Sequence, residues 1–352
     1  MAFTPQLDEL NTVTQKMIMP GVADNYFRSG PLMAKLKTRF TRRWNGPQIQ
    51  ENFLYDAPKG VAYARGGNFG PQIRKQTKTG LLFNARYYQI STVEYLEDIE
   101  VELAGPQAVF STVRQDLRES ALAMSAMLEI AAFRHGQNTG GQDRSLEING
   151  LEEAMTDGAN NTWSGITFPS YGGQTRSGVG SALNSPTGFI SSPSNATMSY
   201  RLLSHTYSSC VLGSQYPDTG LTTNRAMAFM SETFLPHQLV DTKDPEIAFP
   251  GLKFQNATIM QSQYCPGQDG VNDDNLGNYN AAGETFWWLN FGPQGDDAHI
   301  RLWIAQSPKF AFGFTGFKGA QDNNTLVGQT LFAGTITNRM PRLHRALYGI
   351  TG

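Results

Sequence analysis

The sequence predicts an α+β fold, and three features of the chain support this class. Two segments rich in aromatic and branched residues, 49–55 and 81–90, have the composition of β-strands. A long helical pattern follows over residues 106–135. The chain then closes with a β-rich tail, in which strands are expected over 300–305, 310–314 and 325–337.

The first two strands are predicted to form a hairpin with a very long connection. Roughly 25 residues separate them, whereas most hairpin loops have ~2–5 residues. The connection is basic and rich in glycine, as in Arg65-Gly66-Gly67-Asn68-Phe69-Gly70, and it holds few residues that could form a core. We therefore predict that the hairpin contacts a neighbouring molecule instead of stabilising its own subunit.

Charge is segregated along the chain, although 28 basic residues nearly balance 30 acidic ones. Two segments are purely basic and one is purely acidic. Such blocks suit contacts between identical subunits, in which the basic part of one copy meets the acidic part of the next. A solvated basic loop beside an unrelated acidic turn explains the same pattern. The residues concerned are Lys59, Arg65, Arg74, Lys75, Lys78 and Arg86 in the hairpin, Arg28, Lys35, Lys37, Arg39, Arg42 and Arg43 before it, and Glu94, Glu97, Asp98, Glu100 and Glu102 after it.

Composition narrows the class of protein. With 352 residues the chain can bury a sizeable core and form two or more domains. Only 16% of the residues are charged, below the usual ~25%, and 36 are glycine, which predicts a surface largely covered by further copies of the chain. No secretory signal is visible and no apolar run approaches the ~20 residues that span a bilayer, so no membrane partner is expected. Cys210 and Cys265 are predicted to be buried thiols of a cytosolic product.

The predicted helix 106–135 begins at Pro106 and ends in a basic turn followed by Gly136. At ~45 Å, a helix of this length without a coiled-coil repeat needs a sheet or other subunits along its flank. One face carries an apolar stripe at three- and four-residue spacing, made of Phe110, Val113, Leu117, Ala121, Met124, Leu128 and Ala131. Shorter helices are expected over 31–37, 198–212 and 224–235, and further strands over 221–223, 254–262 and 285–291.

No segment has the pattern of a catalytic, cofactor or metal site. The five histidines lack ligand spacing, and although Asp296, Asp297 and His299 are close in sequence, acidic glycine-containing loops often have this composition. Segment 177–181 lacks the ending of a phosphate loop, and segment 272–275 fits no register of a calcium loop. We therefore predict a protein without catalysis, metal or cofactor.

Several local patterns, taken in their order, resemble one family. They include Tyr171-Gly172-Gly173-Gln174-Thr175-Arg176 in the long polar segment and the residues 25–36, 148–151, 217–225, 249–254 and 341–350. Together with the basic arm, the hairpin, the acidic turn and the long helix, this order resembles the tailed-bacteriophage major capsid protein, with its Hong Kong 97-like fold. The resemblance covers nearly the whole chain.

The resemblance implies a division of the chain and a structural role. It implies an N-terminal arm over 1–46, an extended loop over 47–95, a peripheral domain over 96–139 and 301–352 with the spine helix, and an axial domain over 140–300. Such a protein forms hexamers and pentamers that close into an icosahedral head around double-stranded DNA. The expected location is the virion, after assembly in the host cytoplasm. Many relatives carry a cleaved N-terminal scaffolding segment that is not visible here, so a separate scaffolding protein is expected, with a portal and room for a decoration protein.

The basic segment 28–43 has two interpretations. In the resembled fold the N-terminal arm runs near the inner surface, where basic residues would bind packaged DNA through counterion release without reading its sequence. Alternatively, these residues pair with the carboxylates 94–102 of a neighbouring subunit.

Two other functions are compatible with parts of the sequence. A phage tail-tube subunit would also be glycine-rich and self-assembling, but as a β-sandwich it would not contain the long helix. A carbohydrate-active enzyme could use Trp163, Trp287 and Trp288 as sugar platforms, but it needs two carboxylates around a cleft, and no such pair is evident. Aromatic residues inside a strand more often belong to a core.

Overall fold

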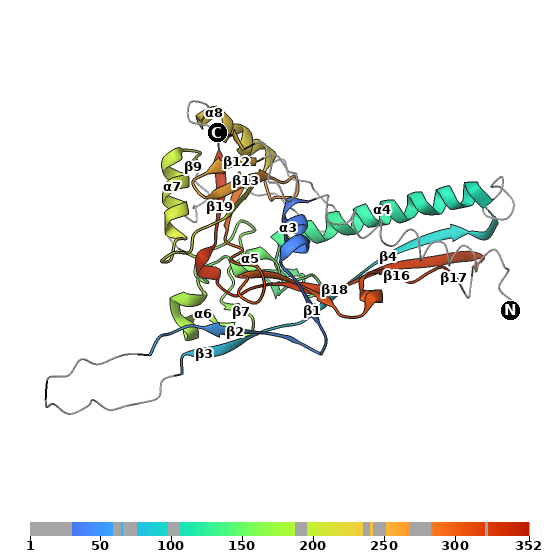
Figure 1. Ribbon diagram of the computed structural model, residues 1–352, viewed down its shortest axis with the longest axis horizontal. Helices are drawn as coiled ribbons and strands as arrows, with labels where there is room; N and C mark the ends of the chain where they lie inside the picture. Colours follow the sequence, from blue (N-terminus) through green and yellow to red (C-terminus); the bar gives the residue numbers. More distant parts are fainter. Residues whose placement is uncertain are drawn as a thin grey trace.

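The computed structural model describes residues 30–58, 65, 76–97, 106–186, 196–234, 240–241, 251–267, 283–320 and 323–351. Two sheets, one of six strands and one of seven, organise these residues. The long helix α4 (Pro106–Phe133) lies along the six-stranded sheet and forms an arm with it, while a hairpin of β2 and β3 leaves the body on the opposite side (Figure 1). The mixture of helix and sheet confirms the predicted α+β class.

The six-stranded sheet is built around β18 (Thr325–Asn338), which has 14 residues. Four strands pair with β18 in antiparallel fashion, and β1 joins β15 in parallel. The members besides β18 are β1 (Thr41–Trp44), β4 (Arg86–Tyr95), β15 (Ile300–Ala305), β16 (Ala311–Phe314) and β17 (Lys318–Gly319).

Helix α4 packs on this sheet through the apolar stripe that the sequence predicts. Val113, Leu117, Ala121, Met124 and Leu128 are all buried. The facing strand is β4, whose Tyr88, Thr92 and Glu94 alternate inward, and Thr92 Oγ1 lies 2.9 Å from Ser120 Oγ of the helix. The helix also contacts β18, so a sheet lies along its flank, which is one of the two arrangements that its length predicts.

The predicted return strand of the hairpin, 81–90, is in fact two strands. The first, β3 (Lys78–Phe83), pairs with β2 (Ile49–Leu54), and the second, β4, leaves the hairpin after Asn84 and Ala85. Strand β4 pairs with β18 along its whole length, from Arg86 opposite Gly334 to Tyr95 opposite Thr325. A local β pattern cannot show this change of partner, because it depends on a strand more than 200 residues away.

The seven-stranded sheet has the order β11-β12-β13-β10-β14-β19-β9. Its β14 is buried on both faces: Phe286 and Trp288 pack in a cluster with helices α7 and α8, while the ring of Trp287 lies 5.6 Å from that of Phe133 at the end of α4. The two sheets therefore meet at the C-terminal end of α4. The elements are β9 (Ala196–Thr197), α7 (Tyr200–Ser209), β10 (Thr219–Thr222), α8 (Asn224–Phe234), β11 (Val240–Asp241), β12 (Gly251–Phe254), β13 (Ala257–Gln261), β14 (Glu284–Leu289) and β19 (Arg345–Thr351).

Several boundaries differ from the prediction. The expected strand 254–262 is a hairpin of β12 and β13, with Gln255 at a positive φ of 52° between them. The strands β1 and β19 were not predicted, and β19 pairs with β14, although the expected division placed residues 301–352 with the spine helix. Both segments contain arginine, and their pairing partners make them strands: β1 lies at the edge of its sheet beside β15, and β19 lies between β14 and β9.

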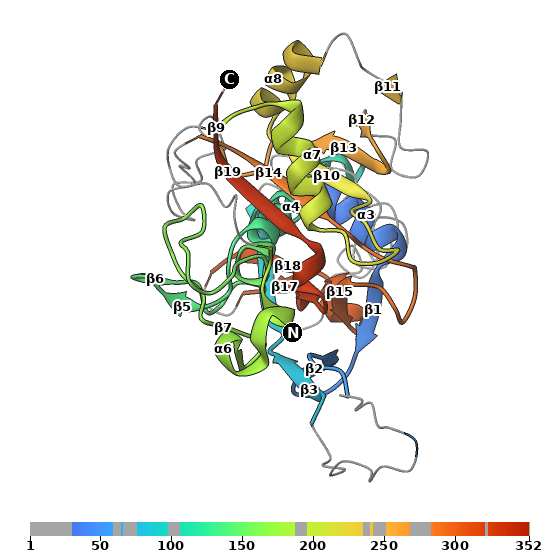
Figure 2. The same ribbon diagram turned by 90° about the vertical axis from the view of Figure 1, so that its left-hand side faces the viewer.

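Short elements fill the segment between the helix and the seven-stranded sheet, and Figure 2 shows several of them beside the hairpin. They are β5 (Asn138–Thr139), β6 (Gln142–Asp143), α5 (Leu151–Ala154), β7 (Ser170–Tyr171), β8 (Gln174–Thr175), α6 (Arg176–Val179) and the 3₁₀ turn η3 (Gly180–Leu183). Two further 3₁₀ turns, η5 (Pro308–Phe310) and η6 (Pro341–Leu343), precede β16 and β19.

The first described helix, α3 (Pro31–Arg39), is capped by a residue of α4. Its N-cap Gly30 has no side chain, and the Leu32 and Met33 amides donate to Glu129 Oε1 at 3.1 Å and Oε2 at 2.8 Å. A Cβ atom on Gly30 would lie 2.4 Å from Glu129 Cδ, so glycine is required for this approach. Burial raises the pKa of Glu129 to about 7, and it does the same for Glu152 and Glu153 of α5.

We expect the cap to make stability depend on pH. Because the native pKa of Glu129 exceeds its ordinary value of 4.5, the folded protein binds this proton more tightly than the unfolded chain between pH 4.5 and 7. The free energy of unfolding of the wild type, relative to Glu129→Gln, should therefore fall by on the order of 3 kcal/mol as the pH rises through this window. Chemical denaturation of both proteins at each pH measures the difference, and parallel pH profiles would contradict the assignment.

The packing of α4 gives a second expectation. Leu117→Ala should lower the free energy of unfolding by ~2–5 kcal/mol, because it leaves a cavity between the helix and the sheet. Leu122→Ala, an identical change at a side chain of the same helix that is 52% exposed, is the control and should cost less than ~0.5 kcal/mol. Equal stability of the two variants in thermal or urea unfolding would show that this face is not the core.

Candidate assembly site at the base of the hairpin

The base of the β2–β3 hairpin is anchored in the body of its own chain. Along β2 the side chains of Ile49, Glu51 and Phe53 point inward, and those between them are exposed. On β3, Leu81 and Phe83 are buried opposite Glu51 and Ile49. The hairpin therefore has an apolar root, and most of its connection, residues 59–64 and 66–75, lies outside the described residues.

A buried carboxylate ties β2 to the six-stranded sheet. Arg301 Nη1 donates to both Glu51 oxygens, at 3.1 and 2.9 Å, and the Arg339 Nε lies 3.6 Å from Oε2. Trp303 Nε1 and Thr337 Oγ1 each donate to Glu51 Oε1 at 3.0 Å. Because Glu51 is shielded from water, its charge has to be compensated by these donors. The donors belong to β15, to β18 and to the residue that follows β18.

The other strand of the hairpin is held by the β7–β8 turn. The Leu82 amide donates to the Gly172 carbonyl at 2.9 Å, and Gln174 Nε2 donates to the Gly80 carbonyl at 3.1 Å. Gly172 has a φ of 56°, and a Cβ atom there would lie 2.9 Å from Leu81 Cβ. Only glycine allows this backbone to approach β3 so closely.

Arg176 in turn holds the β7–β8 turn. It is buried and donates to three backbone carbonyls: Phe168 at 2.9 Å, Glu153 at 2.5 Å and Leu183. Its guanidinium lies over the ring of Tyr171, whose hydroxyl accepts a hydrogen bond from the Asn338 amide at 2.9 Å. The motif 171–176 was identified in the sequence, but only the structure shows that it clamps the root of the hairpin.

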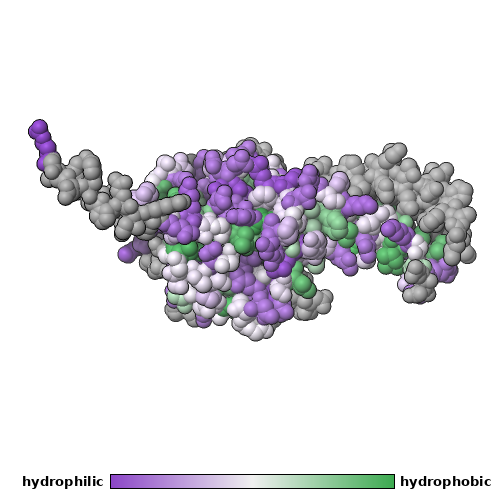
Figure 3. Space-filling view, turned by 90° about the horizontal axis from the view of Figure 1, so that it is seen from below, coloured by the Kyte–Doolittle hydropathy of each residue, from purple (hydrophilic) through white to green (hydrophobic). Residues whose placement is uncertain are grey.

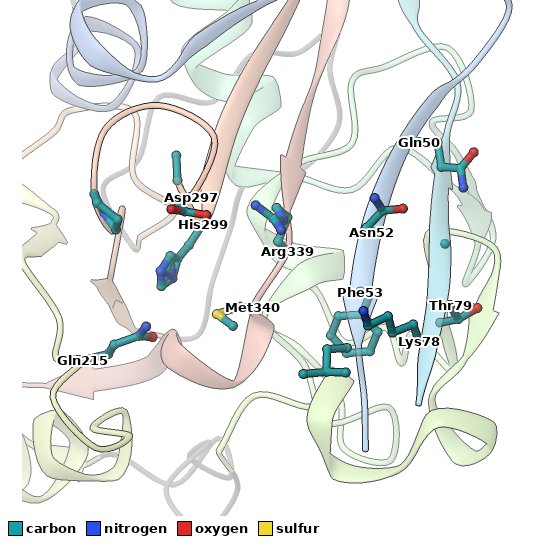
Figure 4. A pocket seen from close by; sticks show the side chains of 14 residues that line it. Gln50, Asn52, Phe53, Lys78, Thr79, Gln215, Asp297, His299, Arg339 and Met340 are labelled. Carbon is teal, nitrogen blue, oxygen red and sulfur yellow. The ribbon is translucent and has the colours of Figure 1, made fainter. Parts of the chain in front are cut away.

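A groove of about 750 Å³ runs between the hairpin and the body (Figure 4). One wall is formed by β2 and β3, and the other by the turn that contains Asp297 and His299 and by Arg339 and Met340. Burial lowers the pKa of His299 to about 4, so this imidazole is neutral at physiological pH. The groove thus offers a mixed polar and apolar wall with little net charge.

The structure places only some of the charged residues that were predicted for contacts between subunits. In the hairpin, Arg65 and Lys78 are exposed, and Lys78 lines the groove. Lys59, Arg74 and Lys75 lie outside the described residues, as do Asp98, Glu100 and Glu102 of the acidic segment.

Among the acidic residues predicted to contact another subunit, Glu94 is buried within its own chain. Glu94 is 8% exposed, because it occupies an inward position of β4 that faces α4. Glu97 is exposed and accepts a hydrogen bond from Asn324 Nδ2 at 2.7 Å, which lowers its pKa. The alternation of a strand therefore places these two carboxylates in different environments.

The basic segment before the hairpin makes contacts within its own chain. Lys35 Nζ lies 3.7 Å from Asp218 Oδ1 and also donates to Thr219, and Arg42 Nη2 lies 2.5 Å from Asp296 Oδ1. Arg43 Nη1 donates to the Ala305 carbonyl at 3.4 Å. Lys37 is half-buried and Arg39 exposed, while Arg28 lies outside the described residues. The sequence predicted DNA or a neighbouring subunit as the partner of this segment, and it did not predict these contacts within the same chain.

Of the three tryptophans considered as sugar platforms, Trp163 is half-buried and the other two lie in the core. Trp287 and Trp288 are fully buried and cannot serve as sugar platforms. Burial raises the pKa of the Cys210 thiol to about 12 and that of Cys265 well above its usual range, so both are unreactive thiols, buried as predicted. Within the described ranges, no group of three His, Cys, Asp or Glu residues is arranged to hold a metal, and no helix is long and apolar enough to cross a membrane.

The surface view shows hydrophobic side chains among hydrophilic ones, including several on the arm (Figure 3). Val93 and Tyr95 of β4 are 48% and 58% exposed on the sheet face away from α4, and both line a shallow hollow with Val327. This face of the arm lacks a covering layer in the described part of the chain.

Comparisons with known proteins identify the fold. No protein-family model matches the sequence, and no curated protein matches it. Solved structures do match. The capsid of cyanophage A-1(L) is 12% identical with a TM-score of 0.61, covering 92% of this chain and 93% of that one. The SrpI encapsulin of Synechococcus elongatus is 9% identical with a TM-score of 0.57, covering 90% and 87%. The capsid of a native GTA particle is 8% identical with a TM-score of 0.55, covering 92% and 91%.

These matches extend over almost the entire length of both chains, so the likeness concerns the whole architecture. At such low identity they establish the fold and nothing finer. The chain has the Hong Kong 97-like fold of phage capsid and encapsulin shell proteins, as the order of the sequence motifs predicted.

The Glu51 network gives a testable expectation. Glu51→Gln keeps the shape of the side chain but leaves the buried Arg301 without a counter-charge, so it should lower the free energy of unfolding by ~3–5 kcal/mol. Glu97→Gln makes the same exchange at an exposed carboxylate and should leave the free energy of unfolding nearly unchanged. Urea denaturation of the two variants measures both values. A Glu51→Gln protein as stable as Glu97→Gln would show that the network does not anchor the hairpin.

Proposed function

We propose that this chain is the major subunit of a phage head. In this proposal it self-assembles into hexamers and pentamers that close into an icosahedral shell around double-stranded DNA, and its role is mechanical, without catalysis. One observation carries the proposal: in a chain with a shell-protein fold, both strands at the root of a long hairpin are fixed to the body by buried contacts.

The geometry of the root supports a role between subunits. Glu51 holds β2 from one side and the β7–β8 turn holds β3 from the other, so the direction in which the hairpin leaves the body is set by buried bonds. The connection 55–77 contains Lys59, Arg65, Arg74 and Lys75 and no carboxylate except Asp56. A fixed root with a basic connection suits a contact that is repeated identically at every subunit.

The same proposal assigns each part of the chain to a domain of the capsid subunit. The arm of α4 and the six-stranded sheet would be the peripheral domain, the seven-stranded sheet with α7 and α8 the axial domain, and the hairpin the extended loop. The shell would be located in the virion after assembly in the host cytoplasm. A separate scaffolding protein, a portal and non-specifically bound DNA are further proposed partners, and a decoration protein is compatible with this scheme.

Assembly of the purified protein tests the proposal. Negative-stain microscopy should show closed shells or capsomers, whereas tubes would indicate a tail-tube subunit, and compact monomers under all conditions would overturn the proposal. Reversing Arg74 and Lys75 together to Glu should slow shell closure and lower its salt tolerance, because each exposed pair contributes ~0–1 kcal/mol but recurs at every subunit. The unassembled subunit should keep its unfolding temperature.

A matched control reverses two exposed basic residues elsewhere, Arg201 of α7 and Lys253 of β12. This control has the same change of net charge, so it separates a local contact from a general effect of charge. If the Arg74 and Lys75 variant assembles like the wild type at every salt concentration, the hairpin does not hold a neighbour through its charge.

A further inference from the structure

The two strands of the hairpin differ in how their outer edges are covered. Among the described residues, strands β2 and β3 pair only with each other. The outer edge of β3 is closed by the β7–β8 turn, through the Gly172 carbonyl and the Gln174 amide. In the described ranges no strand and no backbone hydrogen bond from another element closes the outer edge of β2.

An open strand edge presents a row of backbone N–H and C=O groups that are ready to pair with another chain. Proteins usually protect such an edge with lysine, proline or a bulge. The exposed side chains of β2 are Gln50, Asn52 and Leu54, and its one charged residue, Glu51, points inward to Arg301. The edge therefore carries neither a proline nor an exposed charge along its six residues, and the inward charge of Glu51 is compensated by Arg301 within the same chain.

The groove of about 750 Å³ lies beside this strand (Figure 4). It falls within the ~300–1,000 Å³ range of sites that bind ligands, so a short extended peptide fits into it. A strand of six residues is ~20 Å long and offers its free donors and acceptors at regular intervals. A peptide backbone in extended conformation matches this pattern, and side-chain pockets beside the edge add specificity.

The charges of the groove restrict the kind of peptide. Lys78 and Asp297 are exposed at its walls and offset each other, and Arg339 is already directed at Glu51. A segment with little net charge is favoured, and this chain itself has only 16% charged residues. If the proposed function holds, identical copies surround each subunit and supply such a segment at high local concentration.

We propose that the outer edge of β2 receives an extended segment from a second copy of this chain, which adds a third strand to the hairpin sheet. This inference rests on the proposed function, because it requires neighbouring copies. It makes the root of the hairpin a receiving site, in addition to the contact that the hairpin connection makes elsewhere.

Amide hydrogen exchange tests the proposal on the wild-type protein. Exchange of the β2 amides (49–54), measured by mass spectrometry, should slow at least tenfold when free subunits assemble into shells. The Leu82 amide of β3 is the internal control, because it already donates to the Gly172 carbonyl, and its exchange should change little. If the β2 amides exchange as fast in shells as in free subunits, the strand addition is wrong, while the proposed function is unaffected.

Two other outcomes are also decisive. Protection of β2 in the isolated subunit would show that the chain fills its own groove, which overturns the role of a second copy. Failure to form any shell, dimer or capsomer overturns the proposed function and this inference together.

A pair of matched variants gives an independent test. Leu54→Lys places a charge beside the open edge, whereas Leu82→Lys makes the same exchange on β3, away from the groove; the two side chains are 60% and 46% exposed. Both proteins should keep the unfolding temperature of the free subunit. Assembly should slow about tenfold or more only for Leu54→Lys, and equal assembly rates would contradict the inference.

Discussion

The buried charge of Glu51 is the constraint on which the position of the hairpin depends. A carboxylate removed from water is tolerated only where donors and a counter-charge surround it, and here these come from Arg301, Trp303 and Thr337. Since these donors belong to β15 and β18, the hairpin cannot tilt without leaving buried charges unpaired. Through side chains alone, the network fixes a two-stranded hairpin, which is marginal by itself, to the six-stranded sheet.

A second buried carboxylate connects the N-terminal helix to the spine helix. Glu129 of α4 closes the first turn of α3, and Lys35 at the middle of α3 reaches Asp218 beside the seven-stranded sheet. Helix α3 therefore links α4, which packs on the six-stranded sheet, to the seven-stranded sheet at the start of β10. Both junctions combine apolar packing with a small number of polar contacts that fix the direction of each element.

The chain closes some of its surfaces with its own residues and leaves others uncovered in the described part of the molecule. The root of the hairpin, the end of α4 and both faces of β14 are closed by the chain itself. The edge of β2 and the sheet face with Val93 and Tyr95 have no cover in the described part of the molecule. In a shell of identical subunits, open edges and faces of this kind can be satisfied by neighbours, and the same contact is repeated at every position.

Elements that depend on local pattern could be predicted from the sequence. The stripe from Val113 to Leu128 specifies a helix with one buried face, Pro31 and Pro106 mark helix starts, and the aromatic segment of β14 specifies a core strand, because periodicity and proline geometry act over a few residues. Three features could be learned from the fold alone: which partner each strand has, that residues 81–90 divide between two sheets, and that Glu94 is buried while Glu97 is exposed. The motif 171–176 was visible in the sequence, but its role depends on Gly80 and Leu82, some 90 residues earlier. Contacts between distant segments depend on the whole fold, since pairing and burial are set by which surfaces meet and not by the residues within one segment.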